Sequence, residues 1–244
     1  MKTVTSLLAR QGRPARWLTL GALLVLAAAL ALRLYRLDAQ SLWYDEGNSA
    51  RIAERSAQLI IEGAAGDIHP PLYYLALHVW RALFGASEAA LRSLSVVCGV
   101  GLAMFAGLTA RPLFGTRAGL MAAGLVAVSP FAVYYSQEAR MYALLALEAA
   151  ASTYALLLIL DFGFWIFDSD ARADLPSSIV NRQSSIVLFV LSTAAGLYTH
   201  YAYPFVMIAQ GACVVVWFAA QVARRVPLRP AWGALAAFAG GNLA

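Results

Sequence analysis

Apolar residues run along this chain in long blocks, separated by short polar stretches that hold arginine, proline and glycine. A block of this length can lie in lipid only if it satisfies its own backbone hydrogen bonds, as a helix does. The alternating pattern of a membrane barrel strand is absent from the sequence. The pattern therefore predicts an all-α, polytopic transmembrane helical bundle. The predicted spans are 17–32, 92–110, 118–135, 140–162, 186–200 and 203–222, with the start of another at Trp232.

Two weaker apolar patterns fall in the stretch 35–90, between the first two predicted spans. Residues 45–60 are amphipathic, with Ile52, Leu59 and Ile60 on a different face from the arginines. Residues 70–84 are short for a bilayer crossing and contain polar side chains. We therefore expect interfacial helices in this first outer loop. The whole chain is predicted to form a single membrane domain, 1–244, in which the polar stretch 163–184 is a cytoplasmic connector.

Composition supports this class and fixes an expected orientation. Hydrophobic residues make up 61% of the chain and charged residues only 13%, which is unusual for a soluble domain. The net charge of +5 is carried almost entirely by arginine, and in a membrane protein such charges set topology, so no nucleic-acid partner is expected. The positive-inside rule places the N-terminus in the cytoplasm and 35–90 outside. We expect a multi-pass protein of the cytoplasmic (inner) membrane, with its active site on the periplasmic or extracellular side.

Three polar clusters carry the candidate chemistry. In the first, "WYDE", Asp45 and Glu46 have two interpretations: they cap a surface helix, or they serve a reaction. The second, "GDIHPPLYY", puts Asp67 near His69, which is itself a candidate helix cap before two prolines. The third, "YYSQEARMYAL", has a tight turn between two apolar spans.

The third cluster contains Glu138 and Arg140, which could also form an isolated ion pair. All three clusters are expected on the same face of the membrane, where carboxylates are costly unless they bind something. A carboxylate there can act as a general base for an acceptor hydroxyl, and two can hold a divalent cation with phosphate oxygens. Arg92 and Arg140, at the outer ends of their spans, suit a phosphate group directly.

Four motifs occur in an order that resembles a known family. "WYDE", "DIHPPLYY", "ALRSLSVVCGV" and "FGTRAGLMAAGLVAVSPFAVYYSQEARMYAL" resemble the polytopic GT-C glycosyltransferases, specifically the protein O-mannosyltransferase and aminoarabinose transferase group of family 39 type. The resemblance covers about Leu34 to Leu160, with a looser match at "YTHYAYPFVMIAQ". It implies inverting transfer of a sugar from a polyprenyl-phosphate donor, within membrane lipids, to a polysaccharide, lipid or protein acceptor. Because the chain ends inside an apolar stretch, we expect an N-terminal fragment.

The resemblance also implies roles for individual residues. Asp45 would activate the acceptor hydroxyl, while the lipid phosphate is the leaving group. The phosphate would be held by Arg92, together with either Arg140 or a divalent metal ion near Glu138. The full set of expected site residues is Asp45, Glu46 and Asp67 as catalytic acids, Arg92, Arg140 and His69 at the donor phosphate, Glu138 at the metal, and Tyr44, Tyr73 and His200 lining the pocket.

Two other functions remain open from the sequence. A transporter or flippase-like protein would use intramembrane charges to gate a solute path, and a truncated subunit would have no activity of its own. The polar clusters lie at the ends of spans and in one long loop rather than inside the apolar blocks. That placement favours a reaction at the membrane surface.

Overall fold

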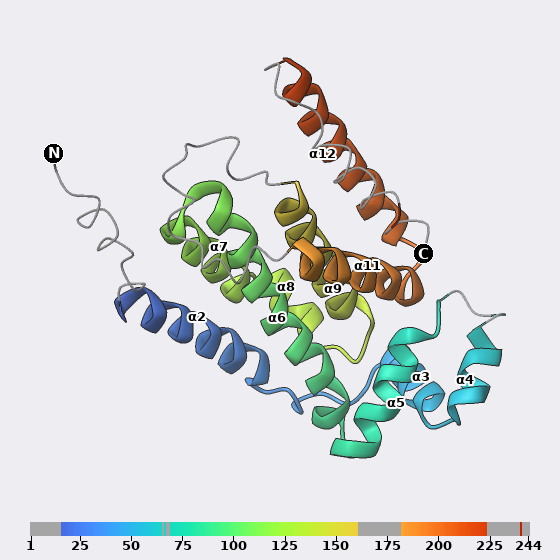
Figure 1. Cartoon of the computed structure of the whole chain (residues 1–244). Coiled ribbons are helices and arrows are strands. Elements are labelled where there is room, and N and C mark those ends of the chain that lie inside the picture. The colour runs from blue at the N-terminus through green and yellow to red at the C-terminus, as the bar shows by residue number, and fades with distance from the viewer. Residues whose placement is uncertain (1–15, 65, 67–68, 161–181, 224–239, 241–244) are drawn as a thin grey trace, which may run out of the picture.

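The computed structural model describes residues 16–64, 66, 69–160, 182–223 and 240, and this part of the chain is helical with no strand. Figure 1 shows a bundle of long helices with a layer of short helices at one end. The helices are α2 (Arg16–Leu34), α3 (Tyr44–Ala53), α4 (Ala57–Ala64), α5 (Leu72–Phe84), α6 (Glu88–Phe114), α7 (Thr116–Val128), α8 (Pro130–Ser136), α9 (Tyr142–Ile159), α11 (Arg182–Thr199) and α12 (Tyr203–Ala223).

The predicted all-α membrane class is confirmed. Four helices, namely α2 from Trp17 onward, α6, α9 and α12, are long and apolar enough to cross a membrane, and α7 with α8 makes a fifth span if the bent pair is counted as one. The expected span at 186–200 corresponds to the shorter apolar helix Gln183–Thr199. Most of the connector predicted at 163–184, and the span start predicted at Trp232, lie outside the described residues.

Two predicted helices are broken in the structure. The span predicted at 118–135 corresponds to α7 and α8 taken together, but this span is bent, because α7 ends at Val128 and α8 leaves at an angle of 60°. The break falls at Ser129, where Pro130 starts the new helix and the Ser129 hydroxyl accepts from the amide of Ala132. The amphipathic helix predicted at 45–60 is likewise divided into α3 and α4.

Helix α6 is the centre of the bundle and packs against α2, α7 and α9. Its approach to α7 depends on two glycines, since a Cβ atom on Gly119 would lie 2.8 Å from the backbone oxygen of Gly107. Small residues at such a crossing let two helix backbones touch, which is how helices associate tightly in lipid. Helix α12 leaves the bundle in Figure 1 and is joined to α9 through polar contacts, in which Tyr203 and Gln210 both donate to the Ser152 hydroxyl at 2.8 Å.

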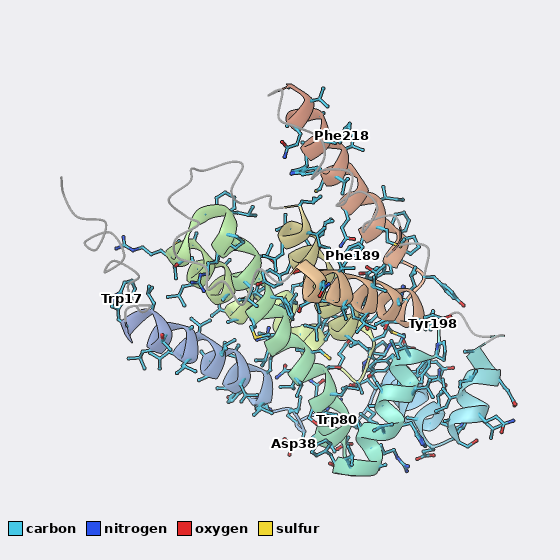
Figure 2. All side chains as sticks on the ribbon, viewed as in Figure 1. Trp17, Asp38, Trp80, Phe189, Tyr198 and Phe218 are labelled. Atoms are coloured by element: carbon cyan, nitrogen blue, oxygen red, sulfur yellow. The ribbon has the colours of Figure 1, made fainter. Side chains whose placement is uncertain are left out.

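The short helices α3, α4 and α5 form a layer over one end of α6. Helix α5 begins directly after Pro71, as the sequence predicts, and is 13 residues long. Trp80 on α5, labelled in Figure 2, donates from its indole nitrogen to the Ser93 hydroxyl at 2.9 Å and to the Ala90 carbonyl at 3.0 Å, which pins α5 to α6. A buried core that includes Tyr73, Leu91 and Met141 joins this layer to α6 and to the loop before α9. Its position at a membrane surface stays a prediction.

Candidate functional site

The acidic pair Asp45 and Glu46 opens α3, in the first turn of the helix. Carboxylates are favourable there because the helix dipole presents its positive end. The amide of Trp43, just before the helix, donates to the Glu46 carboxylate at 3.3 Å. The capping interpretation of the sequence is therefore part of the structure. Glu46 is also completely buried, which a simple surface cap does not require.

Glu46 is buried because it forms a two-pronged ion pair with Arg92 of α6. The Nε of Arg92 donates to one carboxylate oxygen of Glu46 at 2.8 Å, and Nη2 donates to the other at 2.7 Å. The amide of Ala139 adds a third bond at 2.8 Å. A buried ion pair persists only when its remaining polar atoms are also satisfied. This one ties together α3, α6 and the loop before α9.

The guanidinium of Arg92 has no N–H group left over. Besides Glu46, it donates to the carbonyls of Leu37 at 2.9 Å, Gln40 at 2.8 Å and Ser41 at 3.2 Å, so all five of its N–H groups are used. In this geometry Arg92 organises the loop between α2 and α3. The phosphate contact predicted for Arg92 stays a prediction, and it requires one of these bonds to be exchanged.

The electrostatics of Glu46 favour its charged form. Burial raises the pKa of Glu46, but the hydrogen bonds and charge of Arg92, with the amides of Ala139 and Trp43, outweigh it and hold the pKa below its usual range. A carboxylate that is fully hydrogen-bonded and ionised is a poor proton acceptor. The geometry therefore supports a structural role for Glu46, and the catalytic role predicted for it is not tested.

Asp45 has a different environment from its neighbour. Its side chain is 36% exposed, and its Oδ2 lies 3.6 Å from Nη2 of Arg140. Arg140 is buried, and it also donates to the Asp45 carbonyl at 3.4 Å and approaches the Ser49 hydroxyl at 3.5 Å. These contacts are long for charge-assisted bonds. Asp45 is thus held near a cation but remains accessible to solvent.

Two histidines complete this side of the site. The Nε2 of His69 lies 3.5 Å from Nη2 of Arg140, and the rings of His69 and His200 are 5.1 Å apart. Tyr142 lies beside them, with the Cζ of Arg140 5.7 Å from its ring centroid. Asp45, Arg140 and the two histidines come from α3, the loop before α9, the loop before α5 and the turn after α11. The fold therefore gathers residues that lie far apart in the sequence.

The histidine in the turn after α11 is held in one orientation. The amide of Ala202 donates to Nδ1 of His200 at 2.9 Å, which places the proton of the neutral ring on Nε2. Burial lowers the pKa of His200, and the positive charge of Arg140 lowers it further. A neutral imidazole beside a guanidinium can donate a hydrogen bond to an anion without adding a second full charge.

A cavity of about 700 Å³ opens on the other side of the Glu46–Arg92 pair. Glu138 lines it, together with the aromatic side chains of Trp43 and Tyr134. Burial, followed by the negative charge of Glu46, raises the pKa of Glu138, although Tyr134 and the nearby arginines oppose this shift. A concave pocket with aromatic side chains and a few polar groups is typical of a site for a small molecule.

The described residues do not by themselves fit a metal centre. Within this part of the chain, no group of three or more His, Cys, Asp or Glu side chains could hold an ion. Glu138 would supply only one ligand, whereas divalent cations in proteins usually need several oxygen ligands. The metal ion predicted near Glu138 stays a prediction, and we derive no chemical step from it.

The remaining predicted residues are placed as follows. Asp67 lies outside the described residues. Tyr44 is 88% exposed and points away from the protein, whereas Tyr73 is completely buried in the core beneath the site, where burial holds its pKa well above its usual range. Tyr142 and the Ala139 amide were missed. Tyr142 could have been found from the sequence, because it lies two residues from Arg140. The Ala139 amide could not, because a backbone amide leaves no trace in the residue type.

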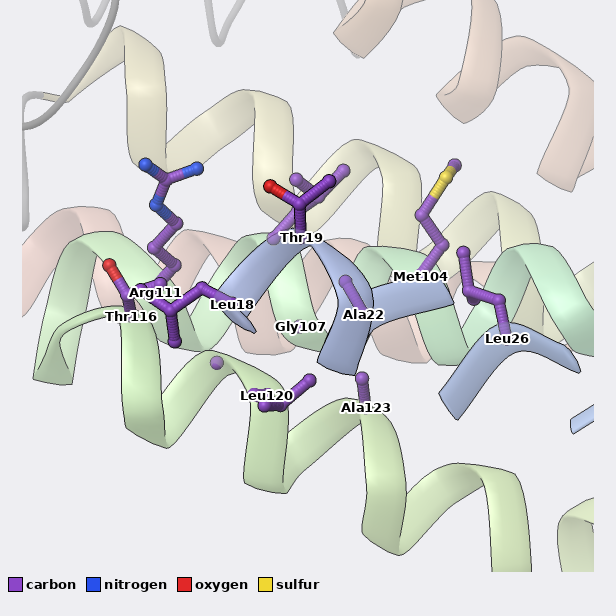
Figure 3. Close-up of a pocket in the computed structure, with 12 residues that line it drawn as sticks. Leu18, Thr19, Ala22, Leu26, Met104, Gly107, Arg111, Thr116, Leu120 and Ala123 are labelled. Carbon is purple, nitrogen blue, oxygen red and sulfur yellow. The ribbon is translucent and has the colours of Figure 1, made fainter. Parts of the chain in front are cut away.

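A second cavity lies at the opposite end of the bundle, between α2, α6 and α7 (Figure 3). Its volume is about 290 Å³, and its lining is mostly apolar, with Arg111 and Thr116 at one end. Arg111 is 19 residues beyond Arg92 on α6, which corresponds to roughly 28 Å at a rise of about 1.5 Å per residue. No carboxylate lines this cavity, so it is separate from the candidate chemistry.

Comparison with known proteins agrees with this architecture. Residues 68–167 match the family model for dolichyl-phosphate-mannose-protein mannosyltransferase. The structure is similar to that of the protein O-mannosyltransferase Pmt1–Pmt2 complex of S. cerevisiae bound to its sugar donor, with a TM-score of 0.72 and 17% sequence identity. The match covers 98% of this chain and 34% of the yeast chain, so the protein spans about a third of the length of that relative. No curated protein matches the sequence.

These comparisons establish the class of protein that the fold defines. The structural match shows that the chain has the GT-C fold, and the family match confirms the resemblance for those parts of the motifs that lie within residues 68–167. The family match includes the His-Pro-Pro motif, α6 and the loop that carries Glu138 and Arg140, and it begins after the acidic turn at Asp45.

Proposed function

We propose that this protein is an integral membrane glycosyltransferase that moves a sugar from a polyprenyl-phosphate donor to an acceptor hydroxyl. The observation that carries the proposal is the contrast between two adjacent carboxylates in a GT-C fold. Glu46 is buried and fully hydrogen-bonded, whereas Asp45 is partly exposed beside Arg140 and two histidines. An accessible acid next to a site for an anion is the minimum that such a transfer requires.

Asp45 acts as the general base in this proposal. Its carboxylate takes the proton from the acceptor hydroxyl as the hydroxyl oxygen forms a bond to the anomeric carbon of the sugar. The bond between that carbon and the phosphate oxygen breaks at the same time, and its electron pair leaves with the polyprenyl phosphate. Because the attack is a single direct displacement, the anomeric configuration is inverted.

Arg140 and the histidines bind the leaving phosphate. The Nε of Arg140 is buried and has no hydrogen-bond partner among the described residues, so the guanidinium retains donor capacity. His69 and His200 lie on the same side and can donate to further phosphate oxygens. Preorganised positive charge at a developing anion is usually the largest catalytic contribution. Arg140 is therefore a better candidate than Arg92, whose donors are all occupied.

The cavity that contains Glu138 supports the sugar-binding part of the proposal. None of Asp45, Arg140, His69 and His200 lines this cavity, so its volume and aromatic lining suit a sugar unit of a polysaccharide, lipid or protein acceptor beyond the reacting centre rather than the sugar that is transferred. The location follows from the sequence: a multi-pass protein of the cytoplasmic membrane whose reaction takes place on the periplasmic or extracellular face.

A transfer assay tests the proposal. Membranes containing the full chain, or its Asp45→Asn variant, are incubated with radiolabelled polyprenyl-phosphate sugars, and labelled product is counted. Loss of the general base should lower transfer about 10²- to 10⁴-fold. Asp38→Asn, an exposed aspartate in the loop before α3, is the matched control and should retain activity. Near-normal transfer by a folded Asp45→Asn protein would refute the assignment, and solute uptake without labelled product would indicate a transporter.

A further inference from the structure

An arginine is buried inside the first candidate span, away from the residues discussed so far. Arg33 lies in the last turn of α2 and is completely buried. Among the described residues, no aspartate or glutamate lies within ion-pair distance of it. A charged side chain in such a position is costly and is retained only when it serves a purpose.

Arg33 donates its hydrogen bonds mainly to backbone oxygens. Its Nη1 donates to the carbonyls of Ala29 and Ala127, both at 3.1 Å, and its Nη2 donates to the carbonyl of Val126 at 3.3 Å. Its Nε donates to the Ser136 hydroxyl at 3.1 Å. Two of these partners are carbonyls in the last turn of α7, and the hydroxyl belongs to Ser136 at the end of α8.

The carbonyls at the end of α7 need an outside donor because of Pro130. In an uninterrupted helix, the Val126 carbonyl would accept from the amide of residue 130, but proline has no N–H. The Ala127 carbonyl would accept from residue 131, but the chain turns by 60° before that residue. Arg33 donates to both carbonyls and so replaces the two hydrogen bonds that the break removes.

A second set of hydrogen bonds joins the same two regions, with the donor after α8 and the acceptors at the end of α2. Gln137, directly after α8, donates from Nε2 to the carbonyls of Tyr35 at 2.9 Å, Arg33 at 3.1 Å and Leu32 at 3.4 Å. These carbonyls are at and just beyond the end of α2. Helix α6 leaves room for the contact, because a Cβ atom on Gly99 would lie 2.6 Å from Nε of Arg33.

We propose that Arg33 is a positioning residue that fixes the direction of α8 and of the loop that follows it. Only two residues separate Ser136 from Ala139, whose amide bonds to Glu46, and Arg140, which faces Asp45, is the next residue. A change in the direction of α8 therefore moves both contacts. The effect on sugar transfer rests on the proposed function, whereas the effect on the geometry does not.

The test combines loss of the arginine with repair of the proline. Arg33→Leu leaves the buried carbonyl of Ala127 and the partly buried carbonyl of Val126 without donors, and the unfolding midpoint in detergent should fall by roughly 5 °C or more. Adding Pro130→Ala returns the N–H to position 130 and lets the helix continue. The double variant should recover most of the lost midpoint but still transfer sugar at least about 10-fold more slowly than the parent, because the straightened helix misplaces the loop.

Two matched variants control for general effects. Pro112→Ala removes a different proline, within α6, and should not rescue Arg33→Leu. Arg117→Leu removes an exposed arginine of α7 and should leave both the midpoint and transfer unchanged. A double variant as unstable as Arg33→Leu would overturn the proposal, and so would one that regains normal transfer.

A distance measurement separates this proposal from the proposed function. Spin labels at the exposed positions Tyr44 on α3 and Tyr134 on α8, with Cys213 replaced by serine, report the placement of α8 directly. The distribution of distances between the two labels should differ between the double variant and the equally labelled parent. Transfer is measured on the unlabelled parent, because Tyr134 lines the cavity beside Glu46 and Arg92. A shift in the labelled double variant, with no transfer by the unlabelled parent, would support the role of Arg33 and contradict only the glycosyltransferase activity. An unchanged distribution would overturn the role of Arg33 even if the parent is active.

Discussion

The ion pair between Glu46 and Arg92 allows a quantitative test of how the site is held together. Glu46→Gln keeps the size of the side chain but removes its charge, so Arg92 becomes a buried cation without a counterion. Breaking one partner of a buried pair typically costs about 3–5 kcal/mol. For a protein of this size, about 2–4 °C of midpoint corresponds to each kcal/mol, so the unfolding midpoint should fall by roughly 6–20 °C. Three carbonyls still bind Arg92, which places the expected loss toward the lower end.

The same ion pair makes the stability of the folded protein depend on pH. The pKa of Glu46 in the folded protein lies below its ordinary value of about 4.3, so its contribution to stability is fully present above that value. The contribution is lost as the pH falls through the lowered folded pKa. The parent protein should therefore lose stability in acid more steeply than Glu46→Gln, which has no carboxyl group to protonate at this position.

The assay is thermal unfolding in detergent between pH 3 and pH 7, followed by the fluorescence of the native tryptophans. Glu62→Gln, an exposed glutamate on α4, is the matched control and should change the midpoint by no more than 1 or 2 °C. Adding Arg92→Leu to Glu46→Gln should cost less than Arg92→Leu alone, with a coupling of at least about 1 kcal/mol. A Glu46→Gln protein with the midpoint and acid profile of the parent would refute the reasoning.

Two further predictions concern packing and electrostatics. Gly119→Ala should destabilise the bundle measurably in the same unfolding assay, because its Cβ would meet the backbone of Gly107, whereas Gly124→Ala, which has open space around it, should be nearly neutral; equal effects would contradict the close approach of α6 and α7. Arg140→Gln should raise the pKa of His200 measured by NMR titration, because a neighbouring positive charge is removed; an unchanged titration midpoint would show that burial alone lowers it.

The sequence was most informative where the membrane itself imposes the structure. A long apolar block must be a helix in lipid, so the all-α class followed from the length of the blocks alone. The two prolines before Leu72 marked the start of α5, and its short length distinguished it from a span. The acidic turn and the Glu138–Arg140 loop were also recognisable as polar clusters at the ends of spans. Side-chain type and spacing were sufficient for these inferences.

The contacts that distinguish one polar residue from the next were not visible in the sequence. Asp45 and Glu46 are adjacent and chemically alike, and only the structure shows that one is buried against Arg92 while the other remains accessible. Arg92 and Arg140 were both expected at a phosphate, but their available donors differ. Pro130 in the sequence indicated a break, but the apolar pattern continues through it, so hydropathy alone predicted one continuous span.

Asp45 and Glu46 are adjacent but should differ in how well they tolerate substitution. Position 46 carries the architecture, so nearly every exchange there should lower the yield of folded protein. The backbone at position 45 is held in place by its neighbour Glu46, so position 45 can accept many side chains without loss of expression. A library randomised at position 45 could therefore be screened for new reactivity in folded protein. The same library at position 46 would mainly show which side chains allow the protein to fold.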